Sequence, residues 1–511
     1  MTAASRLPVA SVVLASVLGS VSCASMGTTA PAVEQPDIGV AVPEAWTTPD
    51  LPPTDVAPAG ELEAGDSEGL APDWWTAFGD PALDQAVQRA LEQNRDLVAA
   101  VSRLEQAAAD SRIAGSGLLP TVEASFNGSR RKQNFIGFPI PGSAGSVLST
   151  VSSNMGVSLD TTWEADLWGR LRAGARASLA DLQATAADYR GAQLSIAGQT
   201  VKAWLAAVEA RQQISLAEET VVSFRASSEQ VRARFESGLR SSLDVRLSLS
   251  SLAGAEALLQ QRRQQLDATQ RQLGVLLGQY SRVDFPIATE LPDVPAAVPA
   301  GLPADLVRRR PDLVAAERRL ASINQQLVVA ERDLYPRISL TGSTGTASGA
   351  LKTLLDPAFS VWSFAGSLLQ PIFQGGRLRA GVDRAEARVD ESLATYAAAA
   401  LQAYAEVEAA LAAEAFFLER LGYLTVSAEQ SRSAVGLAED RYRSGLESFV
   451  TVLESQRLAL QGDGELIAAR RLLLENRVDL YLALGGGFHE LEAPVLLRVD
   501  RDPATVSSDP Q

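Results

Sequence analysis

The 511-residue sequence is poor in the side chains that most enzymes and metalloproteins use, because it contains one cysteine, Cys23, and one histidine, His489. A single cysteine excludes an internal disulfide and a cysteine metal cluster. A single histidine excludes a Ser-His-Asp triad and a multi-histidine zinc site. No pair of carboxylates lies in a context that resembles a catalytic site, so we expect no enzyme activity, no metal and no cofactor.

Basic residues are also too few for a nucleic-acid partner, since 45 Lys and Arg stand against 61 Asp and Glu and leave a net charge of −16. Proteins that bind nucleic acid need basic patches that neutralise phosphates. Long apolar runs are absent as well. No stretch after residue 23 carries 18 uncharged apolar residues, so we expect no transmembrane helix.

The N-terminus predicts export from the cytoplasm. Arg6 and the short apolar run after it resemble a secretory signal peptide over residues 1–22. Cys23 stands where such a segment is cleaved, which predicts an acylated lipoprotein cysteine that anchors the chain to a membrane. An ordinary signal peptide with an incidental cysteine is the alternative. Residues 23–70 are rich in Pro, Ala, Glu and Asp and predict a disordered tether, and residues 491–511 a C-terminal tail.

The chain also contains a long internal repeat. The hexapeptide GRLRAG occurs at residues 169–174 and again at residues 376–381, which is 207 positions later. The stretches RFESGLRSSLDV, from Arg234, and RYRSGLESFVTV, from Arg441, are separated by the same 207 positions, and RDLVAAVSRL and PDLVAAERRL by 216. The chain is therefore a tandem duplication of about 200 residues, far longer than a solenoid repeat.

Each copy predicts a helix, a strand hairpin and a helical hairpin, in that order. In the first copy we expect one initial helix, capped by Asp80 or Asp84 and ended by Pro120. The expected ranges are a first repeat at 71–280 (strands about 120–166, long helices about 169–280), a proline-rich belt at 281–303 and a second repeat at 304–490 (strands about 336–370, long helices about 376–484).

The helical hairpins are expected to be long coiled coils. No proline interrupts residues 142–285 or 372–493, and both spans are rich in good helix formers. Apolar residues recur every 3.5 positions, with a polar break at Glu414, which predicts coiled-coil packing. The helices are interrupted at SGLRSS and SGLESF, where Gly238 and Gly445 fit helix C-termini followed by reversals. These two glycines are the expected tip turns.

The strands raise the question of what closes their edges. If they face lipid they must form a closed barrel, because no open edge survives in hydrocarbon. Four strands per chain are too few, since the smallest membrane barrels have about eight, so several chains would have to contribute. A small soluble sheet beside a coiled coil is the alternative that the alternation of residues leaves open.

Five stretches, in this order, carry a resemblance to a known family: APDWWTAFGDPALDQAVQRALEQNRDLVAA, WEADLWGRLRAG, RRRPDLVAAERRLASINQQLVVAERDLYP, LLQPIFQGGRLRAG and RYRSGLESFVTVLESQRLAL. Together they closely resemble the outer-membrane efflux proteins, the TolC-like channels, and in particular the OprM/NodT-type lipoproteins. The resemblance covers about residues 71–487, which is essentially the whole expected folded part.

The resemblance implies a mainly α fold with a membrane β-barrel. It implies a homotrimer in which four strands per chain form one twelve-stranded barrel, continued by a long α-helical coiled-coil tunnel into the periplasm. The implied location is the outer membrane of a Gram-negative bacterium, in contact with outer-membrane lipid. The implied function is the passive exit duct of a tripartite efflux pump, with a periplasmic adaptor protein and an inner-membrane transporter of the RND class as partners.

The resemblance also places a gate at the periplasmic helical tip. It implies that Val450 is the constriction and that Glu454, one helical turn away on the same face, is an acidic ring. A trimer would gather three such carboxylates, which favour cations. Asp244 matches a family position that stabilises the closed state, and Arg240 and Glu447 are further candidates for closed-state pairing.

Two other functions stay open at this point. One is a type I secretion exit channel for polypeptides; the lipoprotein-like N-terminus and the proline-rich belt favour efflux instead. The other is a non-conducting coiled-coil scaffold of the cell envelope. The aromatic-rich alternating strands speak against a scaffold, which has no need of a barrel.

Overall fold

The computed structural model describes residue 46 and residues 73–135, 148–280, 286–295 and 309–487. Every described residue belongs to one compact unit, Asp37–Gln511. The expected signal peptide, Cys23 and the C-terminal tail lie outside the described residues, as do most of the expected tether and belt.

Two helices stand where the sequence predicts a single first helix. The elements are a short 3-10 helix η1 (Trp74–Phe78), α2 (Pro81–Gln93) and α3 (Arg95–Ser116). Asp80 caps α2, as one of the two predicted caps. The prediction of one continuous helix was wrong because Asn94 interrupts it: its side-chain oxygen accepts two backbone N–H groups of the first turn of α3, at 2.9 and 3.3 Å. Such a cap stabilises a new helix start.

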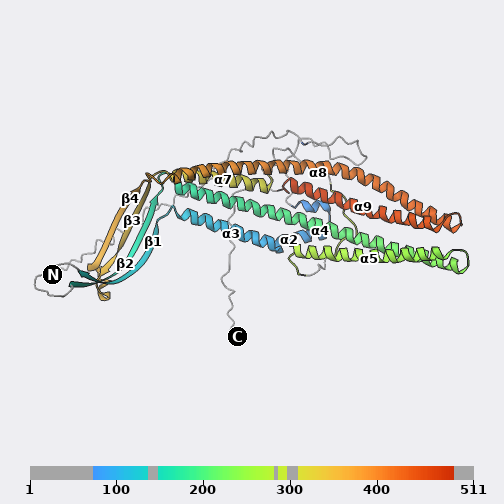
Figure 1. The fold of residues 1–511 in the computed structure, drawn as a ribbon, viewed down its shortest axis with the longest axis horizontal. Coiled ribbons are helices and arrows are strands. Elements are labelled where there is room, and N and C mark those ends of the chain that lie inside the picture. The colour runs from blue at the N-terminus through green and yellow to red at the C-terminus, as the bar shows by residue number, and fades with distance from the viewer. Residues whose placement is uncertain (1–45, 47–72, 136–147, 281–285, 296–308, 488–511) are drawn as a thin grey trace, which may run out of the picture. The chain divides into compact units, whose positions relative to one another are not determined.

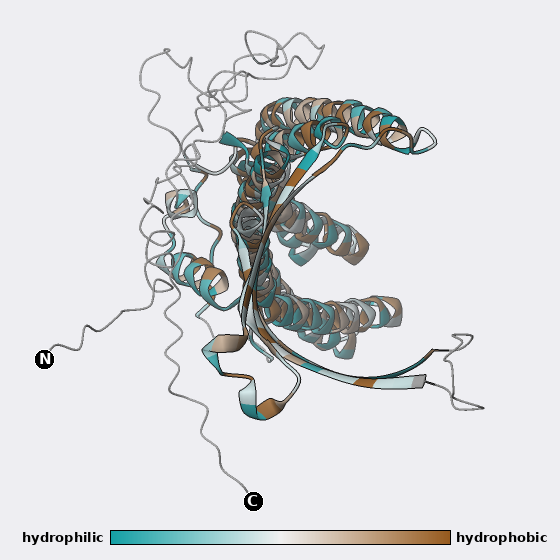
Figure 2. Cartoon of the chain, turned by 90° about the vertical axis from the view of Figure 1, so that its left-hand side faces the viewer, coloured by the Kyte–Doolittle hydropathy of each residue, from teal (hydrophilic) through white to brown (hydrophobic). Residues whose placement is uncertain are grey.

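Four strands form one antiparallel sheet in the order β1-β2-β3-β4 (Figure 1). They are β1 (Thr121–Phe135), β2 (Leu148–Ala165), β3 (Arg337–Ser348) and β4 (Ser360–Leu369), and the short 3-10 helices η2 (Leu351–Thr353) and η3 (Pro357–Phe359) lie between the last two. Each copy contributes one hairpin, and the pairing of β2 with β3 joins the copies. The sheet is curved, as the view in Figure 2 shows, and β1 and β4 are its edges.

Alternation along the strands gives the sheet one apolar face and one polar face. Residues paired in the register share a face, so Phe126 and Val157, which are partners, lie on the same side as Val122. The apolar face carries Val122, Phe126, Val157, Leu159, Trp163, Leu340, Trp362, Phe364 and Leu368. The polar face carries Glu123, Ser125, Ser158, Asp160, Ser343 and Ser363. On it, the Asp160 carboxylate accepts hydrogen bonds from the hydroxyls of Ser158 and Ser343, at 2.7 and 2.6 Å.

Two long helical hairpins follow the strand hairpins, one in each copy. The first consists of α4 (Arg170–Glu236) and α5 (Ser242–Leu276), and the second of α8 (Arg377–Arg443) and α9 (Phe449–Ala483). The lengths are 67 and 35 residues in both copies, and α7 (Pro311–Arg332) matches α3 at 22 residues. This identity of lengths confirms the tandem duplication. None of the helices in the described residues combines the length and the hydropathy that a membrane crossing requires.

The same long-range contact ties the start of the short helix to the end of the returning helix in both copies. In the first copy the Asn94 side-chain amide donates a hydrogen bond to the Leu276 carbonyl, at 3.0 Å. In the second copy the Arg310 guanidinium donates to the Ala483 carbonyl, at 3.2 Å. Asn94 and Arg310 are 216 positions apart, and Leu276 and Ala483 are 207 apart, which are the two offsets of the repeat. The duplicated contact thus persists although its donor has changed from a neutral amide to a cation.

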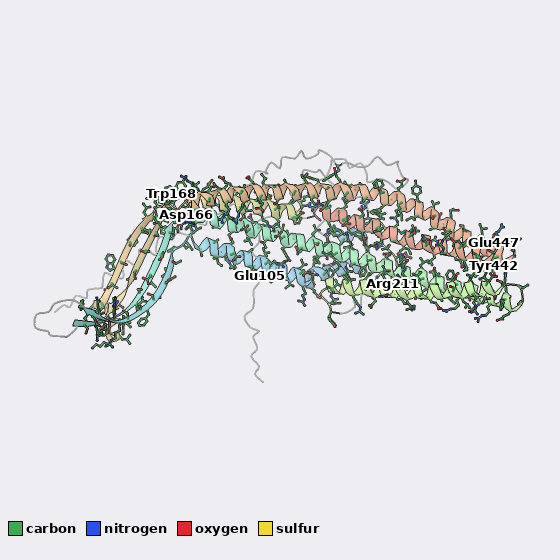
Figure 3. The ribbon with its side chains drawn as sticks, viewed as in Figure 1. Glu105, Asp166, Trp168, Arg211, Tyr442 and Glu447 are labelled. Atoms are coloured by element: carbon green, nitrogen blue, oxygen red, sulfur yellow. The ribbon has the colours of Figure 1, made fainter. Side chains whose placement is uncertain are left out.

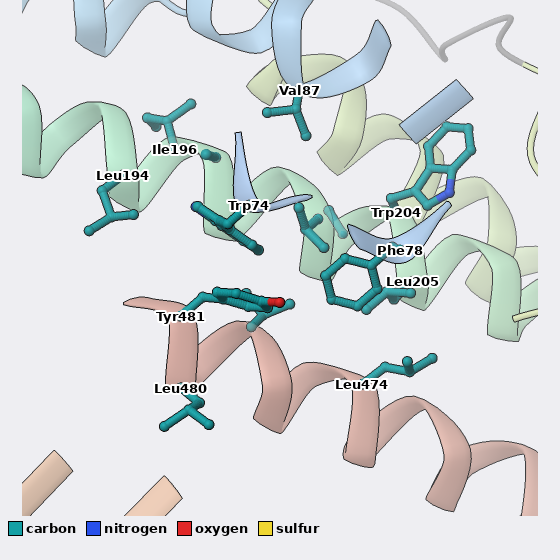
Figure 4. Packing of buried hydrophobic residues seen from close by; sticks show 14 of the residues in the cluster. Trp74, Phe78, Val87, Leu194, Ile196, Trp204, Leu205, Leu474, Leu480 and Tyr481 are labelled. Carbon is teal, nitrogen blue, oxygen red and sulfur yellow. The ribbon is translucent and has the colours of Figure 1, made fainter. Parts of the chain in front are cut away.

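The largest apolar core forms where η1 and α2 pack against α4 and α9 (Figure 4). The Trp74 ring stacks on Tyr481, with centroids 5.0 Å apart, and the Trp204 indole donates a hydrogen bond to the Asp80 carboxylate at 2.9 Å. This core joins helices of both copies about halfway along the hairpins, where α5 and α9 end (Figure 1).

Glu414, the polar break in the expected coiled-coil register, is buried and has a buried partner. Its carboxylate lies 2.5 Å from the guanidinium of Arg477 on α9, and the two side chains are 7% and 6% exposed. Next to this pair, the Asn476 amide donates to the Ala410 carbonyl at 2.9 Å. The break therefore links α8 to α9 by a buried polar contact.

Candidate gate at the tips of the helical hairpins

Both hairpins reverse at a glycine in the left-handed conformation. Gly238 has φ 73° and Gly445 has φ 76°, a region that side chains with a Cβ rarely adopt. In each turn the residue after the glycine donates back to a carbonyl of the long helix: Leu239 to Arg234 and Leu446 to Arg441, both at 2.9 Å. This pattern of bonds satisfies carbonyls at a helix C-terminus. The backbone role expected for the two tip glycines is what the geometry shows.

The returning helices begin at serine caps. The Ser241 hydroxyl accepts the N–H of Asp244 at 3.3 Å, and the Ser448 hydroxyl accepts the N–H of Thr451 at 3.4 Å. A serine cap satisfies one of the free N–H groups at a helix start. Asp244 therefore lies half-buried in the first turn of α5, where a carboxylate also interacts favourably with the helix dipole.

The two tips are joined by arginines of the first hairpin and Tyr442 of the second. The Arg240 guanidinium donates to the Tyr442 carbonyl at 3.1 Å and lies over the Tyr442 ring, 4.2 Å from its centroid. Arg234 lies over the same ring at 5.2 Å. Attraction between a cation and an aromatic face is worth about 0.5–2 kcal/mol, depending on solvent exposure. Figure 3 marks Tyr442 near the end of the hairpins.

A small apolar cluster supports this contact. Val231 of α4 packs with Ala438, Tyr442, Phe449 and Val452 of the second hairpin. The rings of Tyr442 and Phe449 are 5.4 Å apart. Burial raises the pKa of the Tyr442 phenol, with Asp244 adding to the rise and Arg240 opposing it. Tyr442 is therefore neutral at physiological pH and is held on both sides by the first hairpin and by its own.

Glu447 makes its contacts within its own tip. Its carboxylate accepts hydrogen bonds from the Ser448 N–H at 3.2 Å and the Thr451 hydroxyl at 3.0 Å, and it lies 3.8 Å from Arg441. The hydrogen bond from the Ser448 backbone, together with that from Thr451, lowers the pKa of Glu447. Arg240 contacts Tyr442 in the other tip instead, so within the described part of one chain the two candidates for closed-state pairing do not form an ion pair with each other.

Val450 and Glu454 lie on the exposed side of α9. The Val450 side chain is 55% exposed, whereas its neighbours Phe449 and Val452 are buried. The Glu454 carboxylate is exposed and lies 2.6 Å from Arg457, one turn further along α9. Hydrogen bonds from Arg457 lower the pKa of Glu454. The carboxylate is therefore ionised, and its charge is partly compensated by an adjacent cation.

The tip contact also includes three residues that were not predicted for it: Tyr442, Arg234 and Phe449. One signal was present in the sequence: an aromatic residue stands three positions before each tip glycine, Phe235 in the first copy and Tyr442 in the second. The two differ in environment, since Phe235 is 43% exposed and Tyr442 is 6% exposed. The repeat alone does not reveal that only one of the pair lies between the hairpins.

No group of three or more His, Cys, Asp or Glu side chains within the described part of the chain could hold a metal ion. The tip holds charged and apolar side chains that can close or line an opening.

Comparison with known proteins agrees with this architecture. Residues 86–279 and residues 302–486 both match the family model of the outer membrane efflux proteins. The pyoverdine export outer membrane protein OpmQ of Pseudomonas putida is 31% identical over 466 residues, which are 89% of this chain and 93% of that protein. The toluene efflux pump outer membrane protein TtgI of Pseudomonas putida is 33% identical over 414 residues, 80% of this chain and 86% of that protein.

Solved structures show the same fold. The outer-membrane channel OprN superimposes with a TM-score of 0.77 at 30% identity, covering 86% of this chain and 99% of that chain. The outer membrane channel CmeC of Campylobacter jejuni superimposes with a TM-score of 0.77 at 25% identity, covering 88% of this chain and 96% of that chain. The family model matches both copies of the duplication, and the fold is TolC-like. The chain therefore belongs to the outer membrane efflux protein family.

Proposed function

We propose that three copies of this chain form the exit duct of an efflux pump in the outer membrane, closed at rest by the tips of the helical hairpins. The observation that carries the gate is the contact of Arg240 with Tyr442, because it links the hairpins of the two copies at their ends. A duct that opens at its tips must separate these hairpins, so this contact would have to break.

The two faces of the sheet support the barrel. An exposed apolar face suits lipid, and a face lined with hydroxyls and carboxylates suits a water-filled interior. The sheet has two edges, β1 and β4, and no edge can remain open in hydrocarbon. In the proposed trimer, β4 of each copy pairs with β1 of the next, and the three sheets close into twelve strands.

The strength of the tip contact suits a gate that a partner opens. One cation over one ring is worth about 0.5–2 kcal/mol, and a hydrogen bond from a charged donor contributes about 1.5–3 kcal/mol. A docking partner can supply free energy of this size for each of the three copies. We propose that this partner is a periplasmic adaptor protein, and that an RND-type inner-membrane transporter drives export through the passive duct.

Within the gate, Val450 is proposed as the constriction and Glu454 as an acidic ring. Val450 is exposed within one chain, as a side chain that faces an axis must be. Arg457 lies beside Glu454, so the ring is less negative than three isolated carboxylates would be. We propose Asp244 and Glu447 as supports of the closed tip, through Tyr442 and through the α9 cap respectively.

The cargo proposed for this chain is a small molecule. The relatives are named for export of pyoverdine and for efflux of toluene. The acylation of Cys23 is part of the proposal. It is tested by labelling cells with radioactive palmitate, which should mark the wild type and leave Cys23→Ser unlabelled.

The gate is tested by single-channel conductance of purified protein in planar bilayers. We expect small openings in the wild type, larger or more frequent openings in Arg240→Ala, and weaker cation preference in Glu454→Gln. Arg246→Ala is the matched control, because Arg246 is an exposed arginine of the same tip, and no ion pair or hydrogen bond among the described residues joins it to the other hairpin. If neither Arg240→Ala nor Arg246→Ala changed the conductance, the gate would lie elsewhere. A folded, inserted protein that never conducts, even as Arg240→Ala, would favour the scaffold.

A further inference from the structure

The end of the β1–β2 hairpin that lies away from the helices is a basic patch in an acidic protein. Residues 127–135 and 148–156 hold Arg130, Arg131 and Lys132 and no Asp or Glu, although the whole chain carries a net charge of −16. All three cations are exposed. Among the ion pairs of the described residues, none includes any of the three. This part of the sheet therefore presents cationic groups to whatever surrounds it.

The strand divides the three cations between the two faces of the sheet. Side chains alternate along a strand, so Arg130 and Lys132 lie on the apolar face with Val122 and Phe126, and Arg131 lies on the polar face. The register agrees, since Lys132 is paired with Val151 of β2. Two exposed cations thus lie on the apolar face near its outer end, next to Val151.

The opposite end of the sheet carries exposed aromatic side chains where the strands meet the helices. Trp168, after β2, stacks on Tyr335, before β3, with ring centroids 5.4 Å apart. The Trp168 indole donates to the Pro336 carbonyl at 2.8 Å. Trp168 and Tyr335 remain 46% and 41% exposed, and Phe373, after β4, is 87% exposed. Exposed Trp and Tyr at the ends of membrane strands are typical of the boundary between lipid and water.

The spacing of the two ends matches a lipid bilayer. Arg130 and Lys132 are 9 and 11 positions beyond Thr121, the first residue of β1. At roughly 3.4 Å per residue they lie about 31 and 37 Å along the strand. A strand tilt of about 35–45° reduces these lengths to about 22–25 and 26–31 Å along the membrane normal, which bracket the apolar band of about 25 Å in such barrels.

We propose that Arg130 and Lys132 bind the phosphate groups of anionic lipid headgroups in the outer leaflet. The proposal rests on the proposed function, because the apolar face must contact lipid. The occupant follows from charge and depth. Two cations, two positions apart on the lipid-facing side and at the level of the headgroups, match phosphates that a guanidinium can bind through paired hydrogen bonds. Long basic side chains can also extend toward a polar boundary while their stems cover apolar surface.

The test measures lipid binding by purified trimers in neutral detergent, with lipid A as the phosphorylated probe and phosphatidylcholine as the zwitterionic one. The double variant Arg130→Ser with Lys132→Ser should weaken lipid A binding about 30-fold, since each cation near an anionic surface contributes a few-fold to affinity. Arg131→Ser is the matched control on the polar face and should leave lipid A binding unchanged. Phosphatidylcholine binding should be the same in all three proteins.

Unchanged lipid A binding in the double variant would overturn the proposal. That result is expected if a neighbouring chain covers the two side chains. An equal loss in Arg131→Ser would also overturn it, because the effect would then not belong to the outward face. Displacement of lipid A by millimolar inorganic phosphate would indicate a site for free anions instead. Conductance of the same samples separates the two proposals: trimers that conduct but do not select lipid A refute only the lipid site, and folded trimers that never conduct refute the duct.

Discussion

Replacing Glu414 with alanine removes the carboxylate that lies 2.5 Å from Arg477 between α8 and α9. The reciprocal change, Arg477→Gln, removes the guanidinium and leaves the carboxylate in a buried seam. Because the two side chains are only 7% and 6% exposed, water screens their interaction little. Removing one member of a buried pair typically costs about 3–5 kcal/mol of unfolding free energy, mostly because the other charge stays buried. We expect Glu414→Ala to approach this range.

The duplication supplies the variant that should recover the loss. The positions 207 residues earlier hold Ala207 and Gln270, which are both buried. The double variant Glu414→Ala with Arg477→Gln therefore copies a pair that this fold already accommodates. Burial raises the pKa of Glu414 despite the opposing Arg477 charge, so the desolvation of the carboxylate outweighs its attraction to the guanidinium. The double variant should then be close to the wild type in stability.

The assay is urea unfolding of the purified protein in detergent, followed by far-UV circular dichroism, for the wild type, both single variants and the double variant. The two single losses should exceed the double loss by a coupling energy of about 2–3 kcal/mol. Losses that add to within about 0.5 kcal/mol would refute the reasoning, because independent sites behave in that way. A double variant as unstable as the worse single variant would show that the seam does not accept the first-copy residues.

Three further predictions concern close contacts and pH. Gly198→Ala places a Cβ 2.7 Å from a leucine side chain of α9 and should lower the free energy of unfolding in urea by about 1–3 kcal/mol. Its control is Gly254→Ala in α5, which has open space around it and should be neutral or stabilising. Gly345→Ala places a Cβ 2.0 Å from the Val157 carbonyl, so it should abolish assembly of the proposed trimer, measured by size-exclusion chromatography in detergent; normal assembly would contradict the strand register. The pKa of Glu447 is lowered from 4.5, so its contacts are present above that pH and lost as the pH falls through the lowered value. Conductance should therefore rise only below pH 4.5 in the wild type, and a wild-type rise at higher pH would contradict this.

The sequence predicts the features that repeat in both copies, but it does not predict the contacts that differ between the copies. The offset of 207 predicts equal hairpins because backbone geometry depends on local residues, and the tip glycines follow from the need for a positive φ. Alternation predicts the two faces of the sheet. The break at Asn94 was missed because one side chain serves both as a helix cap and as a donor to Leu276, which lies 182 residues away.

Some features of the candidate gate could likewise be predicted from the sequence, and others could not. The location of the tips could be predicted from the two glycines, whereas the role of Val450 as a constriction stays a prediction. The role of Tyr442 could not be predicted, because its burial depends on Arg234 and Arg240 from a hairpin about 200 residues earlier. A contact between two hairpins leaves no periodic pattern in either one. Only the aromatic residue repeated before each tip glycine hinted at it.

Arg240 and Glu447 occupy the same position of the two tips, since they are 207 residues apart. In a ring of three chains the tips of first and second copies alternate. This position is positive in one copy and negative in the other. Each of its charges in the ring therefore has a neighbour of opposite charge on either side. Six identical hairpins could place only like charges next to one another at this position. In the proposed trimer, duplication within one chain would keep a nearly sixfold shape and add a charge pattern that exact sixfold symmetry forbids.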